Sequence, residues 1–221
     1  MPISNRIKLL IPVVILAYPV AFWFAISCGK NHFKRLPVYG PVQVTASGDS
    51  VYHAVRDFHL FNQEGKEISQ KDLDGKVYVA NFFFASCQSV CPQMNENVRR
   101  IQEKFKGSDE VRIVSYTVDP EADSVPVLAE YARKMGADSK QWWFLTGPKD
   151  SIYDLAREGY LLPAAQRIAQ NDFFHSQDLL LIDKEKHIRG IYDGTEPYEV
   201  DTLVDEIKVL LHEYFEKKNE R

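Results

Sequence analysis

Cysteine is scarce in this chain, with three residues in 221, and this scarcity excludes the dense disulfide scaffold of small secreted domains. The sequence also lacks basic patches with interleaved aromatic residues, and its formal net charge is −4, so nothing indicates binding to nucleic acid. Internal repeats and low-complexity segments are missing as well. The composition is otherwise that of a globular protein, long enough for one domain and a short appendage.

Charge is absent from 18 consecutive residues, Leu9 to Ile26. This run is long for the core of a signal peptide and near the lower limit for a membrane span. We therefore predict that residues 1–28 form an uncleaved membrane anchor. The alternative is a lipoprotein signal with Cys28 as the acylated residue, although alanine rather than leucine stands three residues before it. We expect a tether over residues 29–50, a folded domain over 51–217 and a short tail over 218–221.

Strand and helix patterns alternate through the folded domain. A hairpin at its start, within 51–73, precedes the run KVYVANFFFAS at 76–86, which is typical of a strand buried on both faces. A helical pattern follows that run. The later segments are expected as strand 111–119, helix 124–137, strand 141–147, helix 150–160, a hairpin of 178–183 with 187–194, and helix 199–217. This order predicts an α/β, thioredoxin-like fold with a central mixed β-sheet flanked by helices.

Two of the three cysteines, Cys87 and Cys91, lie just after the buried strand, and Pro92 follows the second. Because proline suits the first helical position, we place Cys91 at the N-cap of the helix and Cys87 in the loop before it. Unpaired N–H groups and the helix dipole stabilise thiolates there. The pair is therefore suited to disulfide chemistry or to metal binding, with two buried structural cysteines as the plainer alternative.

A metal site built on two thiolates needs a third ligand, and His175 is the best placed of the six histidines, in a loop that precedes a strand. Two thiolates and one imidazole suit Cu(I) or Cu(II), whereas zinc requires a fourth ligand. We expect surface or packing roles for the other histidines, namely His32, His53, His59, His187 and His212.

Several segments together resemble the SCO/SenC family, over about residues 50–215. The similar segments are FHLFNQEGKEIS, GKVYVANFFFASCQSVCPQM, VSYTVDPEADS and HSQDLLLID. Members of this family are membrane-anchored, thioredoxin-like proteins that assist copper delivery to cytochrome c oxidase. The resemblance implies that Cys87, Cys91 and His175 bind copper, as Cu(I) or Cu(II), and that Asp119 lies near the site. Gln88 and Phe174 depart from the family pattern, in which proline and an acidic residue are common, without removing a ligand.

The resemblance also implies the partners and the location. The partners are the copper-site subunit of cytochrome c oxidase, other copper or thiol-redox proteins, and a membrane through the N-terminal segment. The domain is expected outside the cytoplasm, on the periplasmic side in a bacterium. By this hypothesis the protein is not a turnover enzyme.

A thiol-disulfide oxidoreductase that uses Cys87 and Cys91 is the main alternative. The three-residue spacing and the absence of proline between residues 164 and 196 distinguish the chain from thioredoxin-like redox catalysts, although both roles are compatible. A peroxiredoxin-type peroxidase is disfavoured, because Phe84 stands where a threonine is usual.

Overall fold

The computed structural model describes residues 17–20, 22–23, 35–162 and 176–219. The chain divides after residue 34 into two compact units, and the fold and the site described below belong to the second, Arg35–Arg221. Within the described ranges, no helix is long and apolar enough to cross a membrane. Most of the predicted anchor, together with Cys28, His32 and His175, lies outside the described residues.

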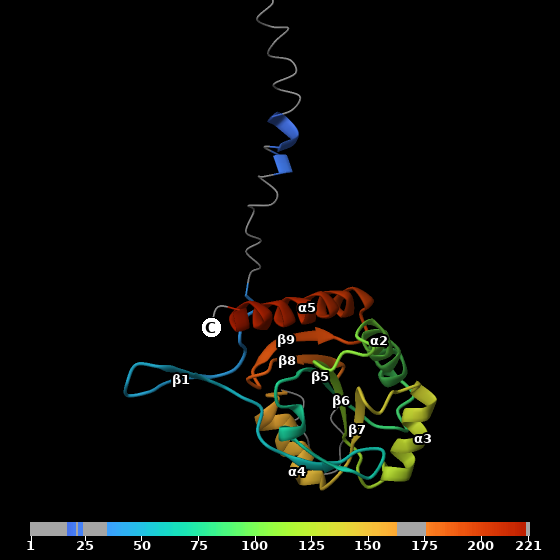
Figure 1. The fold of residues 1–221 in the computed structure, drawn as a ribbon. Coiled ribbons are helices and arrows are strands. Elements are labelled where there is room, and N and C mark those ends of the chain that lie inside the picture. Colours follow the sequence, from blue (N-terminus) through green and yellow to red (C-terminus); the bar gives the residue numbers. More distant parts are fainter. Residues whose placement is uncertain (1–16, 21, 24–34, 163–175, 220–221) are drawn as a thin grey trace, which may run out of the picture. The chain divides into compact units, whose positions relative to one another are not determined.

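A five-stranded sheet in the order β7-β6-β5-β8-β9 forms the centre of this unit (Figure 1). Its strands are β5 (Val77–Phe83), β6 (Val111–Thr117), β7 (Trp142–Leu145), β8 (Asp178–Ile182) and β9 (Ile188–Asp193). Strands β5, β6 and β7 are parallel, whereas β8 is antiparallel to both β5 and β9. The predicted mixed sheet is thus confirmed, with the βαβ connections and the final hairpin in their expected order.

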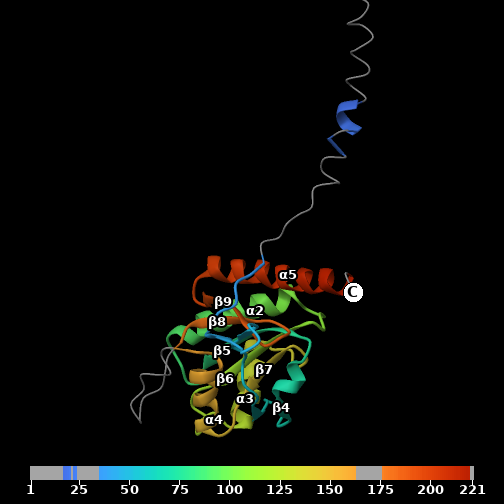
Figure 2. The ribbon, with the colours of Figure 1, turned by 90° about the vertical axis from the view of Figure 1, so that its left-hand side faces the viewer.

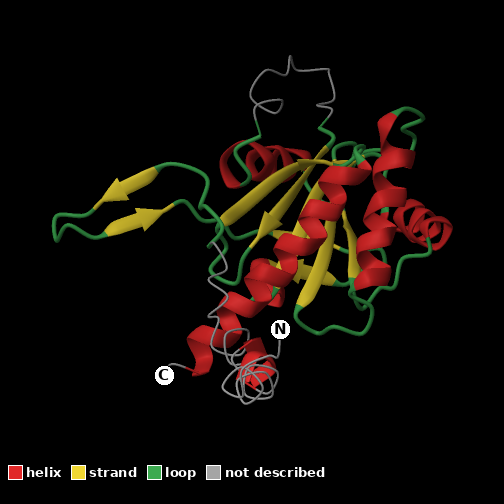
Figure 3. Cartoon of the chain, turned by 90° about the horizontal axis from the view of Figure 1, so that it is seen from above, coloured by secondary structure: helices red, strands yellow, loops and turns green. Residues whose placement is uncertain are grey.

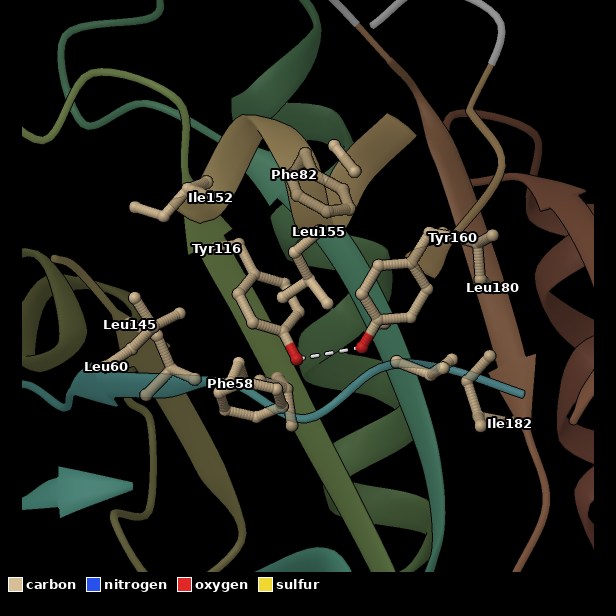
Figure 4. Packing of buried hydrophobic residues seen from close by; sticks show 14 of the residues in the cluster. Phe58, Leu60, Phe82, Tyr116, Leu145, Ile152, Leu155, Tyr160, Leu180 and Ile182 are labelled. Atoms are coloured by element: carbon tan, nitrogen blue, oxygen red, sulfur yellow. Dashed lines mark hydrogen bonds between the residues drawn. The ribbon is translucent and has the colours of Figure 1, made fainter. Parts of the chain in front are cut away.

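The central strand β5 is buried along its whole length, and its side chains alternate between two hydrophobic clusters. Tyr78, Ala80 and Phe82 point to one face of the sheet, and Val77 and Val79 point to the other. Burial on both faces explains why the sequence there is an unbroken apolar run. The first face also holds buried tyrosines, whose hydroxyls meet within the apolar cluster (Figure 4).

Helices cover both faces of the sheet (Figures 1 and 2). They are α2 (Val90–Lys104), α3 (Val125–Met135), α4 (Lys149–Asp154), which the π-helical turn η2 (Leu155–Gly159) continues, and α5 (Pro197–Asn219). Apolar residues of α2, α3 and α5 join the cluster of Val77 and Val79, and those of α4 and η2 join the opposite cluster. Layers of helix on both sides of a mixed sheet confirm the α/β prediction.

Two small hairpins precede the sheet. The second, β3 (His59–Phe61) with β4 (Glu67–Ser69), confirms the predicted hairpin, and the short 3₁₀ turn η1 (Gln70–Leu73) follows it. The first, β1 (Val42–Val44) with β2 (Ser50–Tyr52), extends away from the sheet (Figures 1 and 3). It lies in the stretch where we expected only a tether. Strands of three residues around a polar turn are too short for an alternating pattern to stand out.

Residues 36–39 are held against the sheet by a cluster around Arg189, which is 6% exposed. The Arg189 guanidinium donates to the carbonyls of Leu36 (2.7 Å) and Pro37 (2.9 Å) and to the carboxylates of Asp183 (2.9 Å) and Glu213 (3.3 Å). We call these five residues the Arg189 cluster. It lies beside the start of β9, next to the end of β8 that pairs with the beginning of β5.

Candidate metal and redox site

The two cysteines belong to the junction between β5 and α2, and we call residues 84–89 the cysteine loop. The loop begins with a turn, in which the Cys87 N–H donates to the Phe84 carbonyl at 3.2 Å. A second tie comes from outside the loop, because the Ala85 N–H donates to the Asp123 carboxylate at 3.0 Å. The junction lies at the carboxyl end of a central parallel strand, where sites of α/β proteins tend to occur.

Helix α2 begins two residues earlier than the sequence suggested. Ser89 is its N-cap and Val90 its first residue, so Cys91 and Pro92 are the second and third helical residues. The prediction of Cys91 as the N-cap is therefore wrong. The earlier start costs no helical hydrogen bond. The first N–H groups of a helix have no partner within it, and Pro92, as the third helical residue, has no backbone N–H that would need one. Cys87 lies in the loop as predicted.

Both thiols are free and nearly buried, with 8% of Cys87 and 3% of Cys91 exposed. Burial alone raises the pKa of Cys87, but hydrogen bonds to its sulfur from Cys91 and Ser89 outweigh it and lower the pKa below its usual range; the Ser89 hydroxyl lies 3.6 Å away. Burial, with the hydrogen bond to Cys87 and the charge of that thiolate, raises the pKa of Cys91 to about 12. The two thiols are therefore unequal, and Cys87 is the more easily ionised of the pair.

Asp123 is the acidic residue that contacts the cysteine loop. It is 2% exposed and accepts hydrogen bonds from the Thr117 hydroxyl (2.5 Å) and the Ala85 N–H. Burial raises the pKa of Asp123 against these bonds, and the charge of Asp119 adds to the rise. Asp119, which the resemblance placed near the site, starts the turn that carries Asp123, and its carbonyl accepts the N–H groups of Ala122 and Asp123. Sequence reasoning missed Asp123 because its bond to residue 85 is a tertiary contact.

No group of three metal-ligating side chains occurs within residues 17–20, 22–23, 35–162 and 176–219. The histidines in these ranges have partners elsewhere. His53 lies 2.8 Å from the Gly159 carbonyl, and His59, His187 and His212 lie near the carboxylates of Glu67, Asp183 and Glu216. These contacts confirm the surface and packing roles expected for them.

The start of β8 lies at the same end of the sheet as the cysteine loop, because β8 runs antiparallel to β5. Hydrogen bonds connect this region to the first turns of α2. Gln93 donates to the Thr195 carbonyl (2.8 Å), Asn97 donates to the Gly194 carbonyl (2.8 Å), and the Gly194 N–H donates to the Gln177 carbonyl (2.8 Å). The described chain therefore resumes after residue 175 beside the helix that carries Cys91.

Residues 47–212 match the profile of SCO1/SenC, and the match includes both cysteines and most of the sheet. The chain belongs to the SCO1/SenC family. The resemblance seen in the sequence is thereby confirmed.

Relatives in this family cover most of the chain. A SCO1 protein homolog of Bacillus subtilis is 28% identical over 189 residues, which are 85% of this chain and 91% of that protein. The crystal structure of a SCO1/SenC family lipoprotein from Bacillus anthracis str. Ames is 29% identical, with a TM-score of 0.64 over 72% of this chain and 95% of that one. Agreement with this solved structure supports the thioredoxin-like arrangement.

One similar structure contains copper. It is that of Arabidopsis thaliana ScoI with copper bound, which is 26% identical, with a TM-score of 0.57 over 73% of this chain and 99% of that one. The chain spans about half of a curated mitochondrial relative from the same plant, 47% of its length.

Proposed function

We propose that this protein binds copper through Cys87, Cys91 and His175 and serves the assembly of cytochrome c oxidase, by delivering copper to its copper-site subunit or by preparing the thiols there. One observation carries the proposal: two free, nearly buried thiols lie together at the junction of β5 and α2, and the pKa of one of them is lowered. Thiolates are the ligands that Cu(I) prefers. The copper-bound relative and the relatives described as oxidase assembly proteins support copper as the ligand and the oxidase as the partner.

His175 is the third ligand in this proposal. The described residues offer no other side chain that completes a group of three with the cysteines. Support comes from Ser176 and Gln177, the first described residues after His175, which lie at the sheet end that carries the cysteine loop. Two thiolates and one imidazole form a soft, three-coordinate donor set, which releases copper to a partner by exchanging one thiolate at a time.

A thiol-disulfide exchange role is the second candidate, and the inequality of the two thiols favours it. Cys87, whose pKa is lowered, is the residue that attacks a partner's disulfide as a thiolate, and Cys91, whose pKa is raised, is the residue that resolves the mixed disulfide. A solved relative, BsSco, is 28% identical and is described as having a disulfide switch. Oxidation to a Cys87–Cys91 disulfide removes both thiolate ligands, so copper binding and disulfide formation exclude each other.

Attachment to a membrane, with the domain outside the cytoplasm, belongs to the proposal as well. It rests on the uncharged run Leu9 to Ile26. The anchor and the lipoprotein alternatives differ in the fate of Cys28. Intact mass spectrometry of the protein from membranes distinguishes them, because a lipoprotein loses residues 1–27 and gains acyl chains on Cys28.

A Cu(I) titration tests the metal site. The full chain with Cys28→Ser, reduced and free of metal, competes with a chromophoric chelator, beside the same chain with Cys87→Ser, His175→Ala or His59→Ala. We expect one Cu(I) per chain. Affinity should fall more than about 100-fold in the first two variants, beyond the loss typical of supporting residues, and stay unchanged in His59→Ala. A Cu(I) affinity that is unchanged in His175→Ala would contradict the three-ligand site.

A further inference from the structure

A cavity of about 210 Å³ opens beside Cys87, between α2 and α3. The α2 side contributes Asn95, Glu96 and Arg99, and the α3 side contributes Tyr131 and Lys134. The remaining lining residues are Ala85, Pro92 and Met135. The cavity thus combines apolar walls, two cations, one carboxylate and two neutral polar groups beside Cys87, whereas Cys91 does not line it.

Asn95 lines this cavity and has an unused side-chain oxygen. Its amide nitrogen donates to the Tyr131 hydroxyl at 2.6 Å, whereas its oxygen has no hydrogen-bond partner among the described residues, although Asn95 is fully buried. An unpaired buried acceptor is costly and calls for an explanation. A backbone N–H of an extended peptide that enters the cavity has the chemistry to pair with it.

The charges on the cavity wall are unevenly paired. Glu96 and Arg99 form an ion pair through two hydrogen bonds, of 3.0 and 2.5 Å. Within the part of the chain that the structure describes, Lys134 makes neither an ion pair nor a hydrogen bond. The charge of Glu130 acts on it, but Glu130 is already paired with Arg133. The three charged side chains that line the cavity therefore carry a net positive charge beside Cys87, and a carboxylate is the group that complements it.

We propose that this cavity is the docking site for the partner segment whose cysteine reacts with Cys87, and that it favours a segment with a carboxylate next to that cysteine. The proposal rests on the thiol chemistry of the proposed function and adds how the site chooses its partner. Asn95 pairs with the peptide backbone, Lys134 pairs with the carboxylate, and the apolar walls cover the segment.

The exchange step balances within the two proteins. The Cys87 thiolate attacks the partner's sulfur, a disulfide between them forms, and the partner's original disulfide breaks, with its other sulfur leaving as a thiolate. Cys91 then loses its proton to solvent and attacks the Cys87 sulfur, so that the partner segment leaves with a thiolate. Two electrons pass from the Cys87–Cys91 dithiol to the partner's disulfide.

Two activated peptides test the preference. Both are hexapeptides in which one cysteine forms a disulfide with thionitrobenzoate, and they differ only in aspartate or lysine beside that cysteine. The reduced, metal-free full chain with Cys28→Ser releases the coloured thionitrobenzoate thiolate at a measurable rate. We expect the acidic peptide to react roughly three- to tenfold faster at low salt, and the ratio to fall toward one at 0.5 M salt.

Neighbouring cations on α3 provide the matched control. Lys134→Gln and Arg133→Gln change the net charge equally, but only Lys134 lines the cavity. Lys134→Gln should remove most of the preference, and Arg133→Gln should keep it. Equal ratios in the parent chain, or equal loss in both variants, would overturn the proposal. Copper affinity is measured on the same parent chain. If the peptide preference is missing but Cu(I) binds tightly, the docking proposal fails and the proposed copper function stands. If Cu(I) does not bind but the preference is present, the reverse holds.

Discussion

At one end of the central sheet, the Arg189 guanidinium reaches four acceptors and holds residues 36 and 37 in place. At the other end, Cys87 and Cys91 are equally well buried, but they have no disulfide, and Asn95 keeps an oxygen without a partner. At the first end the buried guanidinium is fully engaged in stabilising contacts. The second leaves reactive groups available, which is how functional sites commonly differ from the scaffold that carries them.

The largest effect should follow from breaking the paired end. Arg189→Ala leaves Asp183 and Glu213 buried without their cation, and we expect the free energy of unfolding to fall by about 3–5 kcal/mol. Urea unfolding followed by circular dichroism measures this loss. Arg133→Ala, whose side chain is 74% exposed beside Glu130, should change it by less than about 1 kcal/mol. Similar losses in the two variants would refute the importance of the Arg189 cluster.

The two thiols at the reactive end should differ next most strongly. In the metal-free reduced chain at pH 7, we expect iodoacetamide to modify Cys87 about 30-fold faster than Cys91. Only thiolates react, and Cys87 ionises more easily. The difference in rate is smaller than the difference in ionisation, because a thiolate of high pKa is the stronger nucleophile. The Cys87 rate should level off above its lowered pKa, whereas the Cys91 rate should climb toward pH 12. Peptide mass spectrometry of quenched samples gives both rates, and equal rates at pH 7 would disprove the assignment.

Asp123 connects the reactive end to the scaffold. Asp123→Ala leaves the Ala85 N–H and the Thr117 hydroxyl without an acceptor, and we expect a loss of about 1–2 kcal/mol in unfolding free energy. Asp123→Asn keeps an oxygen for both donors and removes a buried charge, so its stability at pH 7 should equal or exceed that of the parent chain.

The pH dependence gives the control for Asp123. Its folded pKa is raised, so folding favours the protonated carboxyl, and this contribution is present at low pH and lost as the pH rises through the raised pKa. The advantage of Asp123→Asn over the parent chain should therefore shrink when urea unfolding is repeated at pH 4. An advantage that grows on acidification would show that the charged form is the stabilised one.

The smallest effect should come from the apolar interior between the two ends. Tyr160→Phe removes a hydroxyl that lies 2.8 Å from that of Tyr116 and 3.4 Å from that of Tyr78 (Figure 4). We expect a loss of about 1 kcal/mol, measured as a shift in the thermal midpoint. The control Tyr198→Phe, at a residue that is 81% exposed, should shift nothing. A thiol reactivity unchanged by Tyr160→Phe would confirm that this network supports the scaffold alone.

Periodicity in the sequence predicted the sheet and its helices well, because strong apolar patterns such as 76–86 leave little choice of structure. It failed where patterns are short or contacts are tertiary. The hairpin of β1 and β2 has strands of only three residues, and α2 starts two residues before its predicted start. Asp123 could not be found, because nothing in the local sequence indicates that it bonds to Ala85. The cysteines were singled out because a buried strand, two thiols and a proline occur together, and His175 because of its loop and the family resemblance. The role of all three residues as ligands remains a prediction.

The attachment of residues 36–39 has a consequence for how the protein meets its partner. Tyr39 pairs with Ile188 near the beginning of β5, and the cysteines follow the end of that strand. Seven residues of strand span about 23 Å. Residues 36–39 and the two thiols therefore lie at opposite ends of the central strand. A partner can approach Cys87 without displacing residues 36–39, so docking at the cysteine end leaves the Arg189 cluster intact.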